Sequence, residues 1–181
     1  MTDERLMEML LDGEGQALDK LVLRYQGPLY GFAFRILGDQ GRAEDAFQET
    51  FLKVYRRRYT YQRGTRFKPW LYQICLNVCR DTLRKKKRRP EIPLEAEKLD
   101  GPDDAPGPEE AAHRAAEAEA VREALAELPV KQREVILLSH YQNLSYPEIS
   151  EILDIPTGTV KSRVFHALRR LAKLLGRNKE E

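Results

Sequence analysis

The sequence lacks the features that mark secreted or membrane-bound chains. No apolar run approaches the ~20 residues that span a bilayer, and the first residues, MTDERLMEML, lack the basic-then-apolar order of a signal peptide. Among 181 residues only Cys75 and Cys79 are cysteines, spaced so that one helix face would carry both. These absences predict a cytoplasmic protein with buried free thiols and no membrane partner.

Catalytic and metal-binding motifs are absent as well. There is no glycine-rich phosphate loop, no H-E-x-x-H pair, no nucleophile elbow and no Cys-x-x-Cys. The three histidines, His113, His140 and His166, do not have the spacing of metal ligands. We therefore expect no enzymatic activity, no metal, no cofactor and no small-molecule substrate.

Strand patterns are nearly missing, which predicts an all-α fold. Apolar residues recur at helical spacing from 17 to 37, 42 to 58, 70 to 83 and 131 to 141, and residues 111–128 are rich in alanine and glutamate. Gly27-Pro28 predicts a kink or interruption of the first long helix. The acid-free stretch 59–68 indicates a loop, and Pro69 suits the start of the helix that follows it.

Charge is distributed unevenly along the chain. The formal net charge is only +2, but residues 1–89 hold 19 basic and 11 acidic residues, whereas residues 90–119 hold 2 basic and 10 acidic. Five prolines and two glycines within 90–108 disfavour a packed core there. We predict two small helical domains, 1–89 and 113–181, joined by a flexible acidic, Pro-rich linker at 90–112, and the basic block indicates a polyanionic partner.

The region from 144 to 175 has the pattern of a helix-turn-helix. Ser145 and Glu148 form a capping box, S-Y-P-E, with Leu144 and Ile149 at the two hydrophobic staple positions around it. The tripeptide D-I-P then ends the first helix, and we expect Thr157 to cap a second one.

This second helix has an apolar face and a basic face. The predicted buried side carries Val160, Val164, Ala167, Leu168, Leu171 and Leu175. The opposite side carries Ser162, His166, Arg169 and Lys173, flanked by Lys161, Arg163, Phe165 and Arg170, and no carboxylate lies between 157 and 177. A solvated basic face would also fit, but the cap and the short turn together favour insertion into the DNA major groove.

A second basic region combines aromatic and basic side chains. Residues 59–68, YTYQRGTRFK, contain no acid, and residues 80–89 hold seven bases with Asp81 as the one acid. Stacking surfaces beside cations suit single-stranded nucleic acid. A packed aromatic core would explain part of the set, Phe67 and Trp70 in particular, and the helix macrodipole would explain some of the bases.

The helix at 42–58 has a polar outer side with Glu44, Asp45, Gln48, Glu49 and Lys53. A solvated helix face is the default interpretation, and a docking surface is the alternative.

Three motifs in a fixed order give the chain a recognisable layout. The chain resembles bacterial RNA polymerase sigma factors of the sigma-70 family in three motifs: RAEDAFQETFLKVYRR, RFKPWLYQICLNVCRDTLRKKKRR, and LPVKQREVILL followed by LSYPEISEILDIPTGTVKSR. The two-domain layout is similar to the extracytoplasmic-function (ECF) subfamily. The resemblance covers nearly the whole chain outside the linker.

This resemblance implies three sets of contact residues. The clamp of the largest subunit of core RNA polymerase would bind the docking set: Asp45, Gln48, Glu49 and Lys53. The unwound strand of the promoter −10 element would bind the −10 set: Tyr59, Tyr61, Arg63, Arg66, Asn77, Arg80 and Arg84. The duplex −35 element would bind the −35 set: Thr159, Lys161, Ser162, Arg163, Phe165, His166 and Arg169. The subfamily also makes an anti-sigma factor a possible partner.

Two other classes compete with a promoter-recognition subunit. A stand-alone helix-turn-helix regulator would bind duplex DNA as a dimer, but it predicts an effector pocket or dimer helix where the sequence has a basic aromatic loop. An RNA-binding or structural helical protein would leave the helix-turn-helix unexplained.

Overall fold

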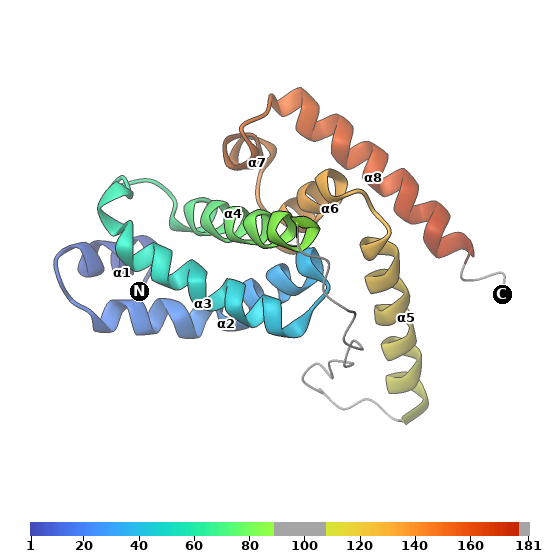
Figure 1. Cartoon of the computed structure of the whole chain (residues 1–181), viewed down its shortest axis with the longest axis horizontal. Helices are drawn as coiled ribbons and strands as arrows, with labels where there is room; N and C mark the ends of the chain where they lie inside the picture. Colours follow the sequence, from blue (N-terminus) through green and yellow to red (C-terminus); the bar gives the residue numbers. More distant parts are fainter. Residues whose placement is uncertain (89–107, 178–181) are drawn as a thin grey trace.

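The computed structural model describes residues 1–88 and 108–177, and their regular secondary structure is helical throughout (Figure 1). The first half contains α1 (Asp3–Leu11), α2 (Gln16–Leu37), α3 (Gln40–Arg56), the 3-10 turn η1 (Arg58–Thr60) and α4 (Phe67–Arg88). The second half contains α5 (Pro108–Ala126), α6 (Val130–Ile136), the π-helical turn η2 (Leu137–Tyr141), α7 (Tyr146–Leu153) and α8 (Thr157–Arg177). The predicted all-α class is therefore confirmed.

Several predicted boundaries differ from the structure. The predicted interruption at Gly27-Pro28 is wrong, because α2 is continuous through Pro28 and its flanking residues Tyr25, Leu29 and Phe32 are buried. Burial of this stripe offsets the one backbone hydrogen bond that proline removes. Helix α4 begins at Phe67, before the predicted start at Pro69. Pro69 therefore lies within the first turn, where backbone N–H groups have no helical acceptor, so the N–H that proline lacks costs no helical hydrogen bond.

The predicted linker lies largely outside the described residues. Helix α5 begins at Pro108, so the predicted linker end at 112 is wrong and residues 108–112 are helical. From residue 116 onward its side chains become progressively buried, and Ala124 and Leu125 are in the core. The alanine-rich pattern thus identified the helix, although not its first residue.

Helix α4 is enclosed along much of its length. The buried residues of α4 outnumber those expected for a single apolar stripe; they are Phe67, Leu71, Tyr72, Ile74, Cys75, Leu76, Val78 and Cys79. Both cysteines are free and buried, as predicted. A hydrogen bond to Cys75, together with burial, raises the pKa of the Cys79 thiol and keeps it protonated.

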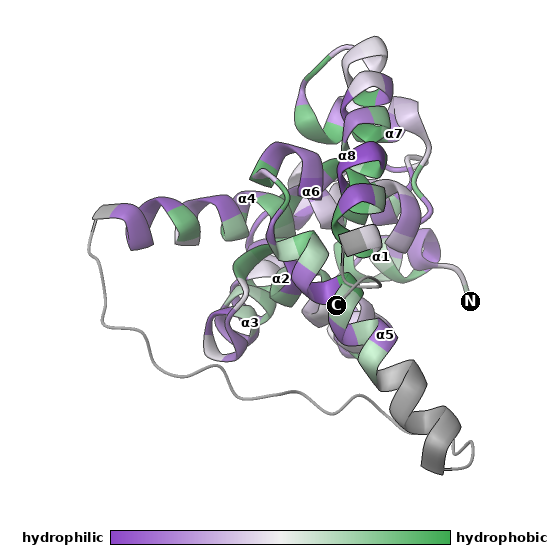
Figure 2. Cartoon of the chain, turned by 90° about the vertical axis from the view of Figure 1, so that its right-hand side faces the viewer, coloured by the Kyte–Doolittle hydropathy of each residue, from purple (hydrophilic) through white to green (hydrophobic). Residues whose placement is uncertain are grey.

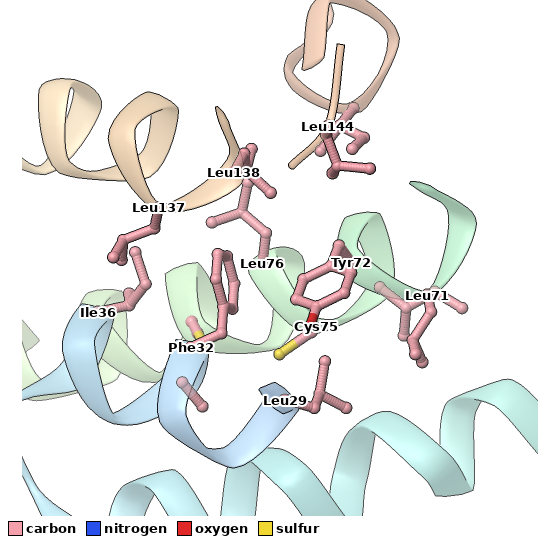
Figure 3. Close-up of a cluster of buried hydrophobic side chains, with 14 of the residues drawn as sticks. Leu29, Phe32, Ile36, Leu71, Tyr72, Cys75, Leu76, Leu137, Leu138 and Leu144 are labelled. Atoms are coloured by element: carbon pink, nitrogen blue, oxygen red, sulfur yellow. The ribbon is translucent and has the colours of Figure 1, made fainter. Parts of the chain in front are cut away.

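The two halves of the chain share one apolar core. Figure 3 shows side chains from α2 and α4 gathered with those of Leu137, Leu138 and Leu144 from the second half. Phe32 of α2 meets the Tyr72 ring edge-on, with the ring centroids 5.1 Å apart. The sequence predicted two helical domains and left their relative arrangement open, so this packing of one half on the other is a finding of the structure.

Polar contacts join the same two halves. The Arg133 guanidinium donates to the carbonyls of Arg35 and Ile36 at 3.5 and 3.2 Å, at the C-terminal end of α2. Arg35 in turn lies 4.6 Å from the centroid of the Tyr141 ring. These carbonyls end a helix and have no helical partner, so Arg133 satisfies acceptors that the N-terminal half leaves open.

The core contains tyrosine hydroxyls with and without a hydrogen-bond partner. The buried Tyr72 hydroxyl has no hydrogen bond, whereas the Tyr25 hydroxyl donates to Asp3 at 2.6 Å. We expect Tyr72→Phe to leave the unfolding free energy unchanged or raise it by up to about 1 kcal/mol, and Tyr25→Phe to lower it by about 1 kcal/mol. Urea unfolding of both variants measures this difference, and an equal loss in the two would contradict it.

Candidate polymerase and nucleic-acid interfaces

The capping box and staple predicted for the helix-turn-helix are confirmed. Ser145 N–H donates to the Glu148 carboxylate at 2.8 Å, while Glu148 N–H donates to Ser145 Oγ at 3.5 Å. Leu144 and Ile149 are both buried. Burial acts to raise the pKa of Glu148, but hydrogen bonds from Ser145 and the charge of Arg66 outweigh burial and lower that pKa. The box fixes where α7 begins.

The turn between α7 and α8 is short and well defined. Asp154 ends α7 in the left-handed region with φ 52°, and Ser150 Oγ donates to the Ile155 carbonyl at 2.5 Å. The Pro156 carbonyl accepts from the N–H groups of Thr159 and Val160 at 2.8 and 3.1 Å. Thr157 is the first residue of α8 and not its cap, so that prediction is wrong by one position.

The outward face of α8 is exposed and basic. Val160, Val164 and Ala167 are buried as predicted, but Leu168 is 44% exposed and does not belong to the buried face. In the −35 set, Thr159 and Arg163 are half-buried, and the other members are exposed: Lys161, Ser162, Phe165, His166 and Arg169. This set therefore reaches solvent together along one helix.

Aromatic and basic groups adjoin on this face. The Phe165 ring lies edge-on to His166 with centroids 5.5 Å apart, and the Arg169 guanidinium lies 5.7 Å from the Phe165 ring centroid. Beside them, a hollow of about 560 Å³ is lined by His166, Arg169 and Lys173 of α8 and by Glu127. The face offers hydrogen-bond donors and an apolar ring, which are the groups that read base edges in a major groove.

The docking set lies on the outer side of α3. Asp45 and Gln48 are exposed, and half-buried Glu49 pairs with Lys53 at 3.8 Å. All four residues line an open hollow of about 700 Å³ between α3 and α4. The predicted residues are thus brought together on a surface that the rest of the described chain does not cover.

The −10 set is divided by the structure. Tyr61 is only 5% exposed and its hydroxyl donates to the Thr65 carbonyl. Its ring packs edge-on against Trp70 and Phe67, with centroids 5.3 and 6.2 Å away. The prediction that Tyr61 offers a free stacking surface is wrong, because this ring anchors the loop that carries the bases. Phe67, also considered as aromatic surface, is fully buried.

An exposed aromatic ladder lies nearby, of which the sequence predicted Tyr59 but neither Tyr55 nor Arg58. The Arg58 guanidinium lies 4.3 Å from the ring centroid of Tyr55 and 4.3 Å from that of Tyr59. It also donates to the Tyr55 carbonyl at 2.7 Å and to the Tyr59 hydroxyl at 3.0 Å. Tyr59 is 71% exposed. The sequence signal was the acid-free stretch Y-R-R-R-Y at 55–59, in which the guanidinium of the third arginine lies over the rings of both tyrosines.

The bases of the −10 set have different partners. Arg63 pairs with Asp12, and Arg84 pairs with Asp81 at 3.0 Å, so both stay within the N-terminal half. Arg66 pairs with Glu148, and Arg80 makes two hydrogen bonds to Glu134 at 2.8 and 2.7 Å, so both reach into the C-terminal half. Asn77 is exposed on α4. The C-terminal end of α4 projects from the body (Figure 2).

Comparison with known proteins assigns the chain to a family. Residues 21–89 match the family model described as Sigma-70 region 2, and residues 118–171 match Sigma-70, region 4. The RNA polymerase sigma-H factor of Pseudomonas aeruginosa is 33% identical over 180 residues, covering 96% of this chain and 93% of that protein. The ECF RNA polymerase sigma factor SigW of Bacillus subtilis is 32% identical over 185 residues, covering 97% of each chain.

Solved structures agree with this assignment. CnrH, solved in complex with the cytosolic domain of CnrY, matches with a TM-score of 0.73 and 25% identity over 96% of this chain and 97% of that one. The sigma factor RpoE of Bartonella quintana, solved with the anti-sigma factor NepR, matches with a TM-score of 0.73 and 26% identity over 87% and 96%. The chain belongs to the sigma-70 family of RNA polymerase sigma factors. Its relatives place it among the ECF members of that family. Within 1–88 and 108–177, none of the helices has an apolar stretch long enough to cross a bilayer.

The two tyrosines of the −10 set have opposite structural roles. We expect Tyr61→Ala to lower the unfolding free energy by about 3 kcal/mol, because it empties a packed aromatic cluster. Tyr59→Ala removes an exposed ring and should change it by no more than about 0.5 kcal/mol. Urea unfolding followed by circular dichroism measures both, and similar losses would show that the loop is not anchored through Tyr61.

Proposed function

We propose that this sigma factor divides promoter recognition among three separate surfaces. Sigma factors of this family direct promoter recognition together with RNA polymerase. In our proposal the docking set on α3 binds the polymerase clamp, the −10 set on η1, the following loop and α4 holds the unwound strand, and the −35 set on α8 reads duplex DNA. The observation that carries the proposal is the charge of the two helices themselves, because α3 has Glu44, Asp45 and Glu49 whereas α8 contains no carboxylate.

Single-strand capture needs a stacking surface beside cations. Tyr59 supplies the exposed ring, and the Arg58 guanidinium lies over the rings of both Tyr59 and Tyr55. Asn77 has an amide that can both donate to and accept from a base edge. Arg66, Arg80 and Arg84 would then bind phosphates. The aromatic part of the proposed site is therefore the ladder of Tyr55, Arg58 and Tyr59, in place of Tyr61.

The experiment that tests the whole proposal is reconstitution. The purified chain is mixed with core RNA polymerase, and transcription is measured from a panel of promoters. Promoter-specific transcripts that require both components support the proposal. Tight binding to duplex promoter DNA by the chain alone, with no effect of polymerase, would favour the rival stand-alone regulator. Because two solved relatives were captured with CnrY or with the anti-sigma factor NepR, we include a protein inhibitor among the expected partners.

The docking surface yields a charge-reversal prediction. We expect Asp45→Arg with Glu49→Arg to weaken binding to core polymerase by more than about tenfold, since loss of paired interfacial charges costs about 2–5 kcal/mol. Helicity should not change, because Asp45 is exposed and the pair of Glu49 with Lys53 is a weak surface pair. The matched control reverses two exposed acids elsewhere, Glu14→Lys with Asp19→Lys. Equal retention of the two variants by core polymerase in a pull-down would contradict the assignment of the docking set.

The α8 surface should contain base readers and phosphate binders. We expect Arg169→Ala to relax discrimination at one −35 base pair by about 1–3 kcal/mol, if its guanidinium reads guanine. Lys161→Ala should weaken binding to all DNA sequences alike, and the number of counterions released on binding should fall by about one. Binding of the holoenzyme to duplexes with single substitutions, at several salt concentrations, separates the two effects. The same sequence-independent loss in both variants would refute this division.

A further inference from the structure

We propose that Phe165 makes −35 recognition by this chain depend on the C5-methyl group of a thymine. The inference rests on the proposed function, in which the exposed face of α8 reads the −35 duplex. It adds a chemical target for a residue whose role the charge of that face does not define. The target is an apolar group on a base, and not a phosphate or a hydrogen-bonding edge.

The Phe165 side chain is held outward by the packing of its own helix. Its exposed fraction is 57%, the highest of any large apolar side chain within the described residues 108–177. The neighbouring Val164 and Ala167 are buried and thereby fix the rotation of α8 on the body. The ring consequently cannot turn into the core. Because apolar surface stabilises only when it leaves water, this ring contributes energy when a partner covers it.

Phe165 adjoins the polar row of α8. At about 100° per residue, Phe165 lies about 60° round the helix from Ser162, while Arg169 lies about 20° from it. The Arg169 guanidinium is 5.7 Å from the centroid of the Phe165 ring. The His166 ring meets it edge-on, with the centroids 5.5 Å apart. A base edge that reaches the Arg169 guanidinium is therefore also close to the ring.

The polar groups of this row cannot detect a methyl group. The Ser162 hydroxyl donates to the Thr159 carbonyl at 3.1 Å, and the Arg169 guanidinium has donors alone. Donors bind acceptors such as guanine N7 and O6. Thymine is the one base that presents a methyl group in the major groove, where apolar side chains contact it. Phe165 is the aromatic member of the −35 set, and its chemistry matches that methyl group.

The contact between Phe165 and Arg169 also limits where the thymine can lie. The 5.7 Å between the guanidinium and the ring centroid is shorter than two base-pair steps of about 3.4 Å each. We therefore expect the thymine within about two base pairs of the guanine that Arg169 reads.

Leu168 provides a comparison on the same helix. It is 44% exposed, and it lies about 120° round the helix from Ser162, twice as far as Phe165. The two side chains could instead form an apolar patch for a protein partner. The guanidinium beside the Phe165 ring favours DNA, because a cation suits a polyanion. The two assignments differ in whether the methyl group of the DNA matters.

The test removes that methyl group. Core polymerase with the full-length chain binds a promoter duplex that yields transcripts in the reconstitution, and each −35 thymine of either strand is replaced in turn by deoxyuridine. This replacement keeps the base pair and removes the methyl group alone. We expect one replacement to weaken binding about fourfold, which corresponds to the roughly 0.8 kcal/mol of one buried methylene. Phe165→Ala should weaken binding to the unmodified duplex by at least about fourfold and abolish the response to that replacement.

Two further variants serve as controls. Leu168→Ala removes an exposed apolar side chain beside the polar row and should keep the full response to deoxyuridine. Phe165→Leu retains an apolar group and should keep part of that response. Circular dichroism should show unchanged helicity in all variants, because both positions are exposed. In a reciprocal experiment, cytosine and 5-methylcytosine are compared at the responsive position. The methyl group should strengthen binding by the wild-type chain and leave Phe165→Ala unaffected.

Three results would overturn the inference. The first is a −35 element in which no thymine replacement weakens binding by the wild-type chain. The second is an equal response to deoxyuridine in the wild-type chain and Phe165→Ala. The third is an equal, sequence-independent loss in Phe165→Ala and Leu168→Ala, which would assign the ring to a protein partner. Failure of the proposed function is distinct, because the reconstitution would then give no polymerase-dependent transcripts, and the inference would fall with it.

Discussion

The burial of α4 on more than one side determines where the other helices lie. Its buried residues, from Phe67 to Cys79, exceed what one apolar face can supply, so helices must cover it from both halves of the chain. The N-terminal half contributes α1, α2 and α3, and the C-terminal half contributes α6, η2 and α7. The helix to which we assign part of the −10 set is in this way also the centre of the apolar core, so the backbone positions of its polar residues are fixed by packing.

Carboxylates have two distinct uses in this arrangement. Those on α3 face solvent beside an open hollow, where a partner protein can reach them. Glu134 is enclosed, and its charge is tolerable only because Arg80 supplies two hydrogen bonds. Glu148 combines both situations, because it caps α7 and also pairs with Arg66. Enclosure against a cation of the other half of the chain therefore distinguishes Glu134 from the carboxylates of α3.

Local patterns were sufficient for much of the fold and part of the site. The capping box at Ser145, the D-I-P turn and the basic face of α8 all depend on residues within a few positions of one another, and each was predicted correctly. The exposure predicted for Tyr61 was wrong, because its burial depends on the tertiary packing of Trp70 and Phe67 against its ring. Residue types alone could not tell an exposed ring from an anchoring one.

The contact between the halves was also missed, although the sequence contains a signal for it. Tyr72, Leu76 and Cys79 recur at helical spacing and form a second apolar stripe on α4, beside the one that was recognised. Glu134 was a further sign, because it is an acid adjacent to the apolar run V-I-L-L. An acid in that setting requires a cation from elsewhere in the fold.

The π-helical turn η2 makes the joint between the halves sensitive to chain length. Each π turn contains one residue more than an α turn, and η2 spans Leu137–Tyr141, between Glu134 and Glu148. Deleting one residue here would let the segment close as an α turn and would leave the direction of the chain beyond it nearly unchanged, because a π turn accommodates its extra residue within a single turn. Adding a residue has no such compensation and would rotate Leu144 and the α7 cap by about 100° away from α4. Among homologues, deletions at this point should therefore be tolerated better than insertions.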